Sequence, residues 1–77
     1  MGKVIHYYDK INVGIVELKG ILKVGDTVRI KGNHTDLTQA VDSMQIEHKQ
    51  VEKAKAKDVI GMKVGEPVRE GDMVYKA

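Results

Sequence analysis

The chain has 77 residues, enough for one small domain but not for two cores, and this excludes most enzymes that need a separate cofactor domain. Hydrophobic residues make up 42% and charged residues 31%, without any cysteine, so we expect a globular protein held together by packing alone. The formal net charge of +2 permits contact with nucleic acid or an acidic surface but requires neither. No signal peptide or membrane-spanning stretch is recognisable, which predicts a cytoplasmic protein.

The apolar residues of the chain predict β-strands. Eleven Val and seven Ile stand against three Leu, and branching at Cβ favours strands over helices. Strands are expected at Lys3 to Tyr8 and at Val13 to Leu18, joined as a hairpin. Thr27 to Lys31 alternates polar and apolar residues, which places Val28 and Ile30 inside.

The middle of the chain is less regular. Gly32 to Asp36 has the composition of a loop, and Leu37 to His48 is expected to form one longer strand. Its apolar residues break strict alternation once, which we attribute to a β-bulge. Glu47 to Lys57 has no clear helical stripe and no cap, so an exposed connection pinned by Val51 and Ala54 is expected.

The last third predicts two strands around a turn. Val59 to Val64 alternates again, Glu66 to Asp72 carries the only proline, and Met73 to Lys76 forms the final strand. The segments Lys23 to Asp26 and Arg69 to Asp72 share a basic residue, any residue, Gly and Asp. Each predicts a Gly-Asp turn that leads into a strand.

Together these elements predict an all-β fold, a single small antiparallel β-barrel of about six strands that spans residues 1–77. Its expected core is Val4, Val16, Leu18, Val28, Ile30, Val41, Met44, Ile46, Ile60, Met62, Val64 and Val74.

Motifs for catalysis, metals or nucleotides are weak. Gly20 to Thr27 approaches a phosphate-binding loop, but Asp26 stands where the motif needs lysine and a strand follows where it needs a helix. His34 and Asp36 are the nearest approach to a metal pair, in a loop where both are ordinarily solvated. Ser43 is the only serine and is expected in mid-strand without a base. We therefore predict no cofactor, no metal and no enzymatic activity.

Basic residues crowd one connection and offer the best candidate site. Lys49, Lys53, Lys55 and Lys57 fall within nine residues. Such an exposed lysine cluster would contact RNA phosphates. It would equally serve as a solvated edge that prevents sheet-to-sheet aggregation.

Two adjacent tyrosines add a possible stacking surface. In a strand, one of Tyr7 and Tyr8 faces the core and the other faces outward. The outward ring, near His6 and Lys10, would stack on a base or fill the barrel rim. Lys10 is therefore included among the candidate RNA-binding residues.

Several of these motifs carry a resemblance to known barrels. Gly14 to Ile30, with its Gly-x-Val and Lys-Val-Gly-Asp-Thr, resembles the second domain of translation GTPases such as elongation factor Tu, and the likeness continues through Ala56 to Gly61 and Arg69 to Val74. Thr35-Asp36 and the Pro67 to Asp72 segment also resemble the C-terminal barrel of collagenase-like peptidases.

The resemblance implies a translation-protein type of barrel but transfers little chemistry. The glutamate and asparagine with which elongation factor Tu holds aminoacyl-tRNA correspond to Asp42 and Val59, and valine cannot replace an amide. Lys57 replaces the glycine usual in the family's turn. Without a GTPase domain, no nucleotide hydrolysis is expected.

Two functions follow as hypotheses. The first is a non-catalytic, translation-associated module that binds ribosomal or transfer RNA, or a translation protein, through exposed lysines. The second is an accessory barrel that positions substrate or protein for an enzyme on another chain, of the collagenase-like peptidase type.

Overall fold

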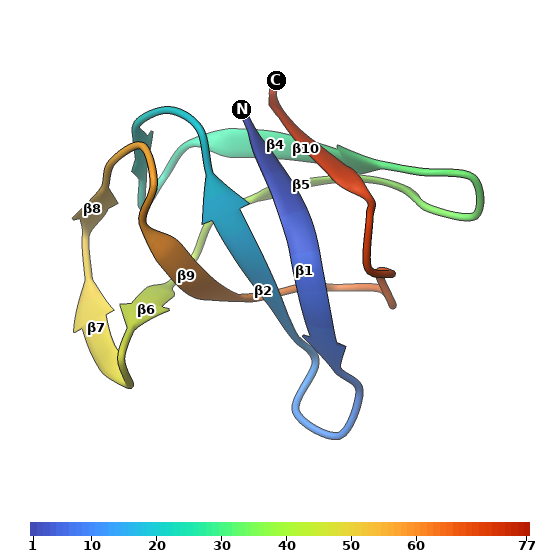
Figure 1. Ribbon diagram of the computed structural model, residues 1–77, viewed down its shortest axis with the longest axis horizontal. Helices are drawn as coiled ribbons and strands as arrows, with labels where there is room; N and C mark the ends of the chain where they lie inside the picture. The colour runs from blue at the N-terminus through green and yellow to red at the C-terminus, as the bar shows by residue number, and fades with distance from the viewer.

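The computed structural model describes all residues, 1–77, and contains ten β-strands and no helix, so the predicted all-β class is confirmed (Figure 1). No element is a helix that could span a membrane. The strands are β1 (Gly2–Tyr8), β2 (Val13–Leu18), β3 (Leu22–Lys23), β4 (Thr27–Lys31), β5 (Asp36–Ala40), β6 (Met44–Ile46), β7 (Lys49–Val51), β8 (Lys53–Ala54), β9 (Val59–Lys63) and β10 (Met73–Lys76).

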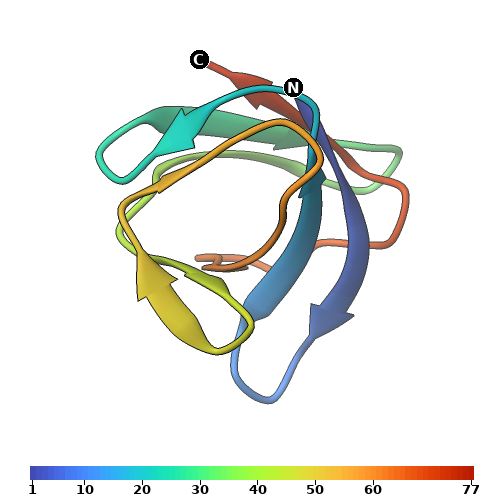
Figure 2. The same cartoon turned by 60° about the vertical axis from the view of Figure 1, so that its left-hand side comes forward.

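Eight strands form one antiparallel sheet in the order β5-β4-β10-β1-β2-β9-β6-β7, and β3 pairs with β8 in a separate two-stranded sheet. The predicted hairpin of the first two strands is present, with an irregularity in β1 between Val4 and His6. Figure 2 shows the strands curving around a common centre. The sheet is therefore a barrel that β5 and β7, its two edges, do not close by pairing with each other.

Individual hydrogen bonds link β5, one edge of the open sheet, to neighbouring parts of the barrel. The side chain of Gln39 on β5 donates to the carbonyl of Lys63 at 2.8 Å and accepts from the backbone N–H of Gly65 at 2.8 Å. Val41, just after β5, accepts from Gly25 N–H and donates to the Asp26 carbonyl. The Gln39 bonds hold β5 beside the end of β9, where no strand ladder exists, and the Val41 bonds continue the β4–β5 pairing beyond Thr27 and Ala40.

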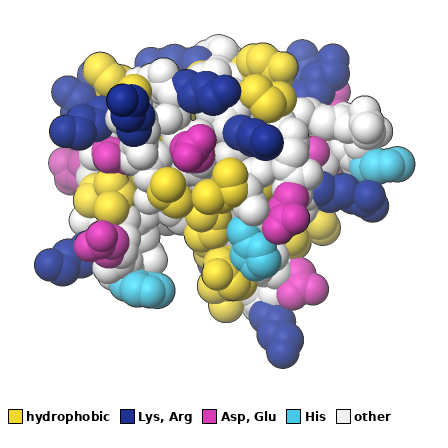
Figure 3. All heavy atoms as spheres, in the orientation of Figure 1, with side chains coloured by type: hydrophobic (Ala, Val, Ile, Leu, Met, Phe, Trp, Pro, Cys, Tyr) yellow, Lys and Arg dark blue, Asp and Glu magenta, His cyan; other side chains and the backbone are white.

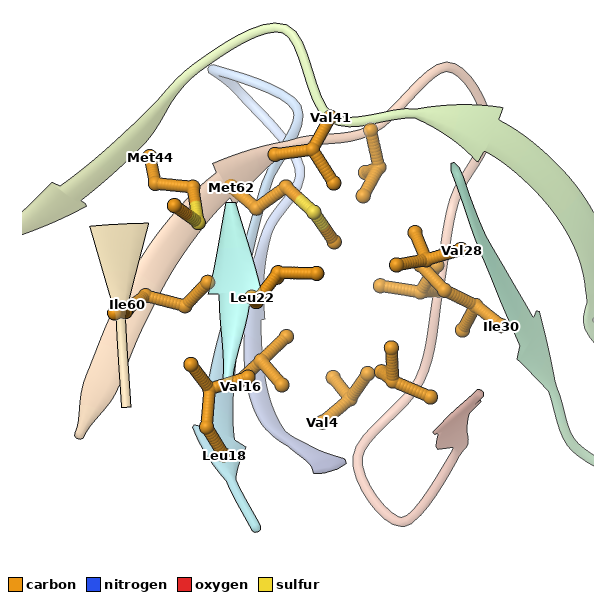
Figure 4. Close-up of a cluster of buried hydrophobic side chains, with 14 of the residues drawn as sticks. Val4, Val16, Leu18, Leu22, Val28, Ile30, Val41, Met44, Ile60 and Met62 are labelled. Atoms are coloured by element: carbon orange, nitrogen blue, oxygen red, sulfur yellow. The ribbon is translucent and has the colours of Figure 1, made fainter. Parts of the chain in front are cut away.

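The core confirms most of the predicted positions. Eleven of the twelve expected core residues are buried, while Ile46 is only partly buried against the cluster. Figure 4 shows Val4, Val28, Ile60 and Met62 directed into the same interior from three strands, β1, β4 and β9. Four further buried apolar residues lie outside the predicted core list: Leu22, Leu37, Ala54 and Val68.

The predicted long strand from Leu37 to His48 is wrong. The chain leaves β5 after Ala40, crosses without strand structure through Ser43, and starts β6 at Met44. β5 pairs with β4, whereas β6 pairs with β9 and β7. The step of three between apolar residues thus marks a crossing between two parts of the barrel and not a bulge, and Ser43 is not in mid-strand.

The connection predicted for Glu47 to Lys57 is also more ordered than expected. Glu47 and His48 have positive φ values of 52° and 66° and form the turn of a β6–β7 hairpin. Lys53 and Ala54 then pair with β3, and Ala54 is buried as predicted. The strand number rises from about six to ten because such short segments find backbone partners.

Three turns share one set of hydrogen bonds. In each, the backbone N–H of a basic residue donates to the carboxylate of the aspartate three residues later, at 3.0, 3.0 and 2.8 Å. The aspartate N–H donates back to the carbonyl of the basic residue, at 3.0, 3.1 and 3.0 Å. The turns span 23–26, 55–58 and 69–72, and lead into β4, β9 and β10. Two of them are the predicted Gly-Asp turns, and the third contains Lys57, where the family resemblance implies a turn.

The third residue of each turn has a positive φ: 97° at Gly25, 76° at Lys57 and 92° at Gly71. This conformation is typical of the third position of a type II turn and is free of a Cβ penalty only for glycine. Lys57 therefore holds a left-handed conformation that the other two turns assign to glycine.

Candidate protein-contact surfaces

The structure separates the five lysines predicted as a site. Lys53 lies in β8, and Lys55 and Lys57 lie in the turn that follows it. Lys49 begins β7, next to the β6–β7 turn, and Lys10 lies in the β1–β2 turn at the opposite end of the barrel (Figure 1). All five side chains are exposed, but only three of them belong to one surface.

Two lysines that the sequence analysis did not single out join these three. Lys57 N–H donates to the Leu18 carbonyl at 2.8 Å, which places Lys19 beside the 55–58 turn. Lys23 on β3 lies directly opposite Lys53 on β8. We call the group Lys19, Lys23, Lys53, Lys55 and Lys57 the basic end. Figure 3 shows basic side chains gathered over β3 and β8, at the upper left.

The basic end has no internal charge compensation from ion pairs. The structure contains three ion pairs, and none includes a lysine of this group. The Asp58 carboxylate beside them accepts a backbone N–H of Lys55, within its turn. Lys23 and Lys53 are cross-strand neighbours of like charge, which destabilises a strand pair. This surface therefore carries an excess of positive charge, although the net charge of the whole chain is only +2.

Apolar side chains lie among these lysines. Ile21 and Val24, which flank β3, are 51% and 40% exposed. No tyrosine belongs to this part of the chain, because Tyr7 and Tyr8 lie in β1 and Tyr75 lies in β10. The basic end therefore combines ammonium groups with aliphatic surface and lacks an aromatic ring for base stacking.

A second surface is apolar and lies on the outer face of β1, β2 and β9. Ile5, Tyr8 and Val59 are between 40% and 49% exposed, and Val13 and Ile15 are partly exposed beside them. A Cβ placed on Gly61 would meet Val13 and Ile15 at 3.4 and 3.5 Å, so these two side chains lean over the glycine. We call these five residues, Ile5, Tyr8, Val13, Ile15 and Val59, the outer stripe. Figure 3 shows hydrophobic side chains running down this face towards the β1–β2 turn.

The predicted orientation of the two adjacent tyrosines is confirmed. Tyr7 packs partly buried against the core, and Tyr8 faces outward at 49% exposure. The ring of His6 meets that of Tyr8 edge to face at a centroid distance of 4.4 Å, and His6 Nδ1 lies 3.2 Å from the Glu70 carboxylate. The outward ring thus has a fixed neighbour on the protein and forms the lower part of the outer stripe.

The histidine and aspartate considered for metal binding do not form a metal site. The structure has no group of three or more His, Asp or Glu side chains placed to hold an ion. His34 and Asp36 line a hollow of about 250 Å³, but the Asp36 carboxylate accepts two hydrogen bonds of 2.9 Å from the Arg29 guanidinium. These bonds lower the pKa of Asp36, so it stays an ion-paired carboxylate and does not serve as a free base.

Comparison with known proteins identifies a relative that matches nearly the whole chain. The chain is 46% identical over 76 residues to a Methanocaldococcus jannaschii protein described as an uncharacterized protease. The match covers 97% of this chain but only 19% of that protein, so the chain spans about a fifth of the length of its relative. No protein-family model matches the chain.

The fold matches solved structures closely. Two crystal structures of the C-terminal domain of a Geobacillus thermoleovorans protein described as a U32 peptidase, one of them a selenomethionine variant, each superpose with a TM-score of 0.93 at 22% identity. They cover 97% and 99% of this chain, and 95% and 89% of the solved domains. The barrel therefore has the fold of that C-terminal domain.

These matches correct the first functional hypothesis. The resemblance to collagenase-like peptidase barrels is supported, whereas the resemblance to elongation factor Tu is not shown. The predicted translation role is wrong, and so are the predicted ribosomal RNA, transfer RNA and translation-protein partners, because the relatives are a protease and a peptidase domain. The cytoplasmic location stays a prediction.

Proposed function

We propose that this chain is a non-catalytic accessory β-barrel that contacts a peptidase domain of the U32 type and helps to position its polypeptide substrate. The observation that carries the proposal is the match of nearly the whole chain to a fifth of a protease. A segment of that proportion, with the fold of a peptidase C-terminal domain, accompanies a much larger polypeptide. The chemistry of hydrolysis then belongs to the larger part.

The composition of the barrel supports a non-catalytic role. It has no cysteine, and its single serine, Ser43, has no hydrogen bond to a histidine. A nucleophile needs such a base within reach. The three histidines lie apart, in β1, the β4–β5 loop and the β6–β7 turn. None of these segments supplies a nucleophile and base together.

The outer stripe is the surface that we assign to the peptidase contact. A contiguous group of exposed aliphatic and aromatic side chains is typical of protein interfaces. The occupant is the polypeptide that makes up the other four fifths of the relative, because a barrel within such a chain has that polypeptide as its constant neighbour. Burial of Ile15 and Tyr8 there would remove apolar surface from water.

Mixing the barrel with a peptidase part tests the proposal. The Methanocaldococcus jannaschii protein is made without the stretch that matches this chain, and that stretch is made separately as a positive control. Calorimetry measures binding of each barrel, and fluorescent casein measures hydrolysis. We expect this chain to bind, and to change casein hydrolysis only when the peptidase part is present. Casein hydrolysis by the barrel alone, or binding of the control stretch only, would overturn the proposal.

A matched pair of variants locates the contact. Ile15→Asp places a charge in the outer stripe, and Thr38→Asp places one on the exposed face of β5. We expect at least tenfold weaker binding for Ile15→Asp, since loss of one central apolar contact is worth about 1.4 kcal/mol or more. Thr38→Asp should bind as the unchanged chain does.

A further inference from the structure

The basic end carries two features that the fold does not need. Lys57 occupies a left-handed position where both equivalent turns use glycine, although the hydrogen bonds of the three turns are the same. Lys23 and Lys53 are placed opposite each other on paired strands. Both choices disfavour the folded state. Local strain of this kind persists where a site uses it.

We propose that the basic end binds a carboxylate-rich, extended polypeptide segment. Five exposed ammonium groups without ion-pair partners supply donors for several carboxylates at once. Lys57 adds its ammonium group to this surface although its positive φ is unfavourable for a residue with a Cβ. The complementary partner is therefore acidic.

The aliphatic residues within the basic end favour a polypeptide over a nucleic acid. Single-stranded nucleic acids are held by aromatic rings that stack on bases, and none lies in β3, β8 or the 55–58 turn. Ile21 and Val24 offer apolar contacts among the lysines instead. An acidic segment with aliphatic side chains would satisfy both chemistries.

The local acidic groups do not neutralise the site. Asp58 and Asp26 each accept a backbone N–H within their turns, from Lys55 and Lys23, and Asp26 also lies 3.5 Å from Lys76. Glu52 is exposed beside Lys53 and forms no ion pair. The five lysines of the basic end therefore outnumber the acidic residues beside them.

The biological meaning of this site rests on the proposed function, because a captured acidic segment would be presented to the peptidase. The binding itself does not need the peptidase. The two ideas therefore fail separately: an acidic peptide tests the basic end with the barrel alone, whereas the peptidase part tests the accessory role.

The experiment uses fluorescein-labelled deca-glutamate and measures its anisotropy with the full chain at low and at moderate salt. We expect binding that weakens as salt increases. Replacing Lys53, Lys55 and Lys57 together by glutamine should weaken it about tenfold, since three exposed charge contacts of a few tenths to 1 kcal/mol each add to about that factor. Lys10→Gln with Lys49→Gln is the matched control, and it should change binding less than about twofold because both lysines lie outside the basic end.

Lys57→Gly separates the site from the fold. This variant should raise the melting temperature by releasing the left-handed strain, and yet weaken peptide binding by about two- to threefold. Absence of peptide binding, equal weakening by the control pair, or unchanged binding by the triple variant would each overturn the proposal. Tighter binding of a ten-nucleotide uridine RNA than of the peptide would also overturn it, because the partner class would be wrong.

Discussion

The 55–58 turn has the same hydrogen bonds as the turns at 23–26 and 69–72 but a different residue at its third position. All three hold an aspartate carboxylate on the backbone N–H of a basic residue, and all three deliver the chain into a strand. Two place glycine at positive φ, and one places Lys57 there. The hydrogen bonds alone therefore fix the turn, and glycine only removes a steric penalty.

The turns also differ in how deeply they are anchored. The side chain of Asp72 is buried, with the residue only 5% exposed. A Cβ on Gly32 would overlap the Asp72 carboxylate, so this turn packs tightly against the β4–β5 loop. Asp58 is only partly buried. The comparison teaches that one local hydrogen-bond pattern serves a buried anchor at one place and an exposed surface at another.

The largest expected effect comes from removing the buried anchor. Asp72→Ala should lower the free energy of unfolding by about 2–3 kcal/mol, since a hydrogen bond to a charged group is lost at a buried site. Asp58→Ala should lower it by about 1 kcal/mol because water replaces part of the bond. Urea unfolding measures both. Asp42→Ala, at an exposed residue, is the control, and equal losses at 58 and 72 would show that burial does not set the difference.

Exchanging the residue at positive φ tests the steric part of the comparison. Lys57→Gly should stabilise the barrel by about 1 kcal/mol, and Gly71→Lys should destabilise it by about 1–2 kcal/mol. In a domain of this size, 1 kcal/mol corresponds to a melting-temperature shift of about 4–8 °C, which calorimetry detects. A loss of stability in Lys57→Gly would mean that the lysine side chain stabilises the fold.

The smallest effect concerns the first turn, whose aspartate has a second basic neighbour. The backbone N–H of Lys23 lowers the pKa of Asp26 below its ordinary value, and the Lys76 ammonium at 3.5 Å adds to this. The carboxylate therefore contributes stability that is complete above its ordinary pKa and is lost as the pH falls through the lowered one. Asp26→Asn should be less stable than the unchanged chain at neutral pH, and the difference should shrink as the pH falls through the lowered pKa of Asp26. A constant difference would contradict this assignment.

Alternation made most of the fold predictable. Polar and apolar residues alternate strictly in β4, so only one pairing register buries Val28 and Ile30 and leaves Arg29 exposed. The final strand is predicted to the residue, since the Asp72 turn defines where Met73 begins. The burial of Leu22 escaped prediction, and Ala54 was expected only to pin a connection, because strands of two residues have no periodicity to read.

The surfaces were harder to predict because they are assembled across strands. Lys53, Lys55 and Lys57 are close in sequence and could be grouped, whereas Lys23 joins them only through the pairing of β3 with β8. Lys49 was grouped with them because it is near in sequence, but it lies at the start of β7, at the end of that strand away from β8. The third turn was indicated only by the family resemblance, because Lys57 stands where the other two turns have the glycine that marked them.

The position of β10 determines the order in which the sheet can assemble. Met73–Lys76 are the last strand residues of the chain, but they lie between β4 and β1. In the eight-stranded sheet, the β4–β5 hairpin is joined to the five strands that begin with β1 through β10 alone. The hairpins can form from neighbouring residues, but the sheet becomes continuous only when two distant parts of the chain meet. Folding of this barrel is therefore limited by contacts of long sequence separation, and it completes only when its last strand is in place.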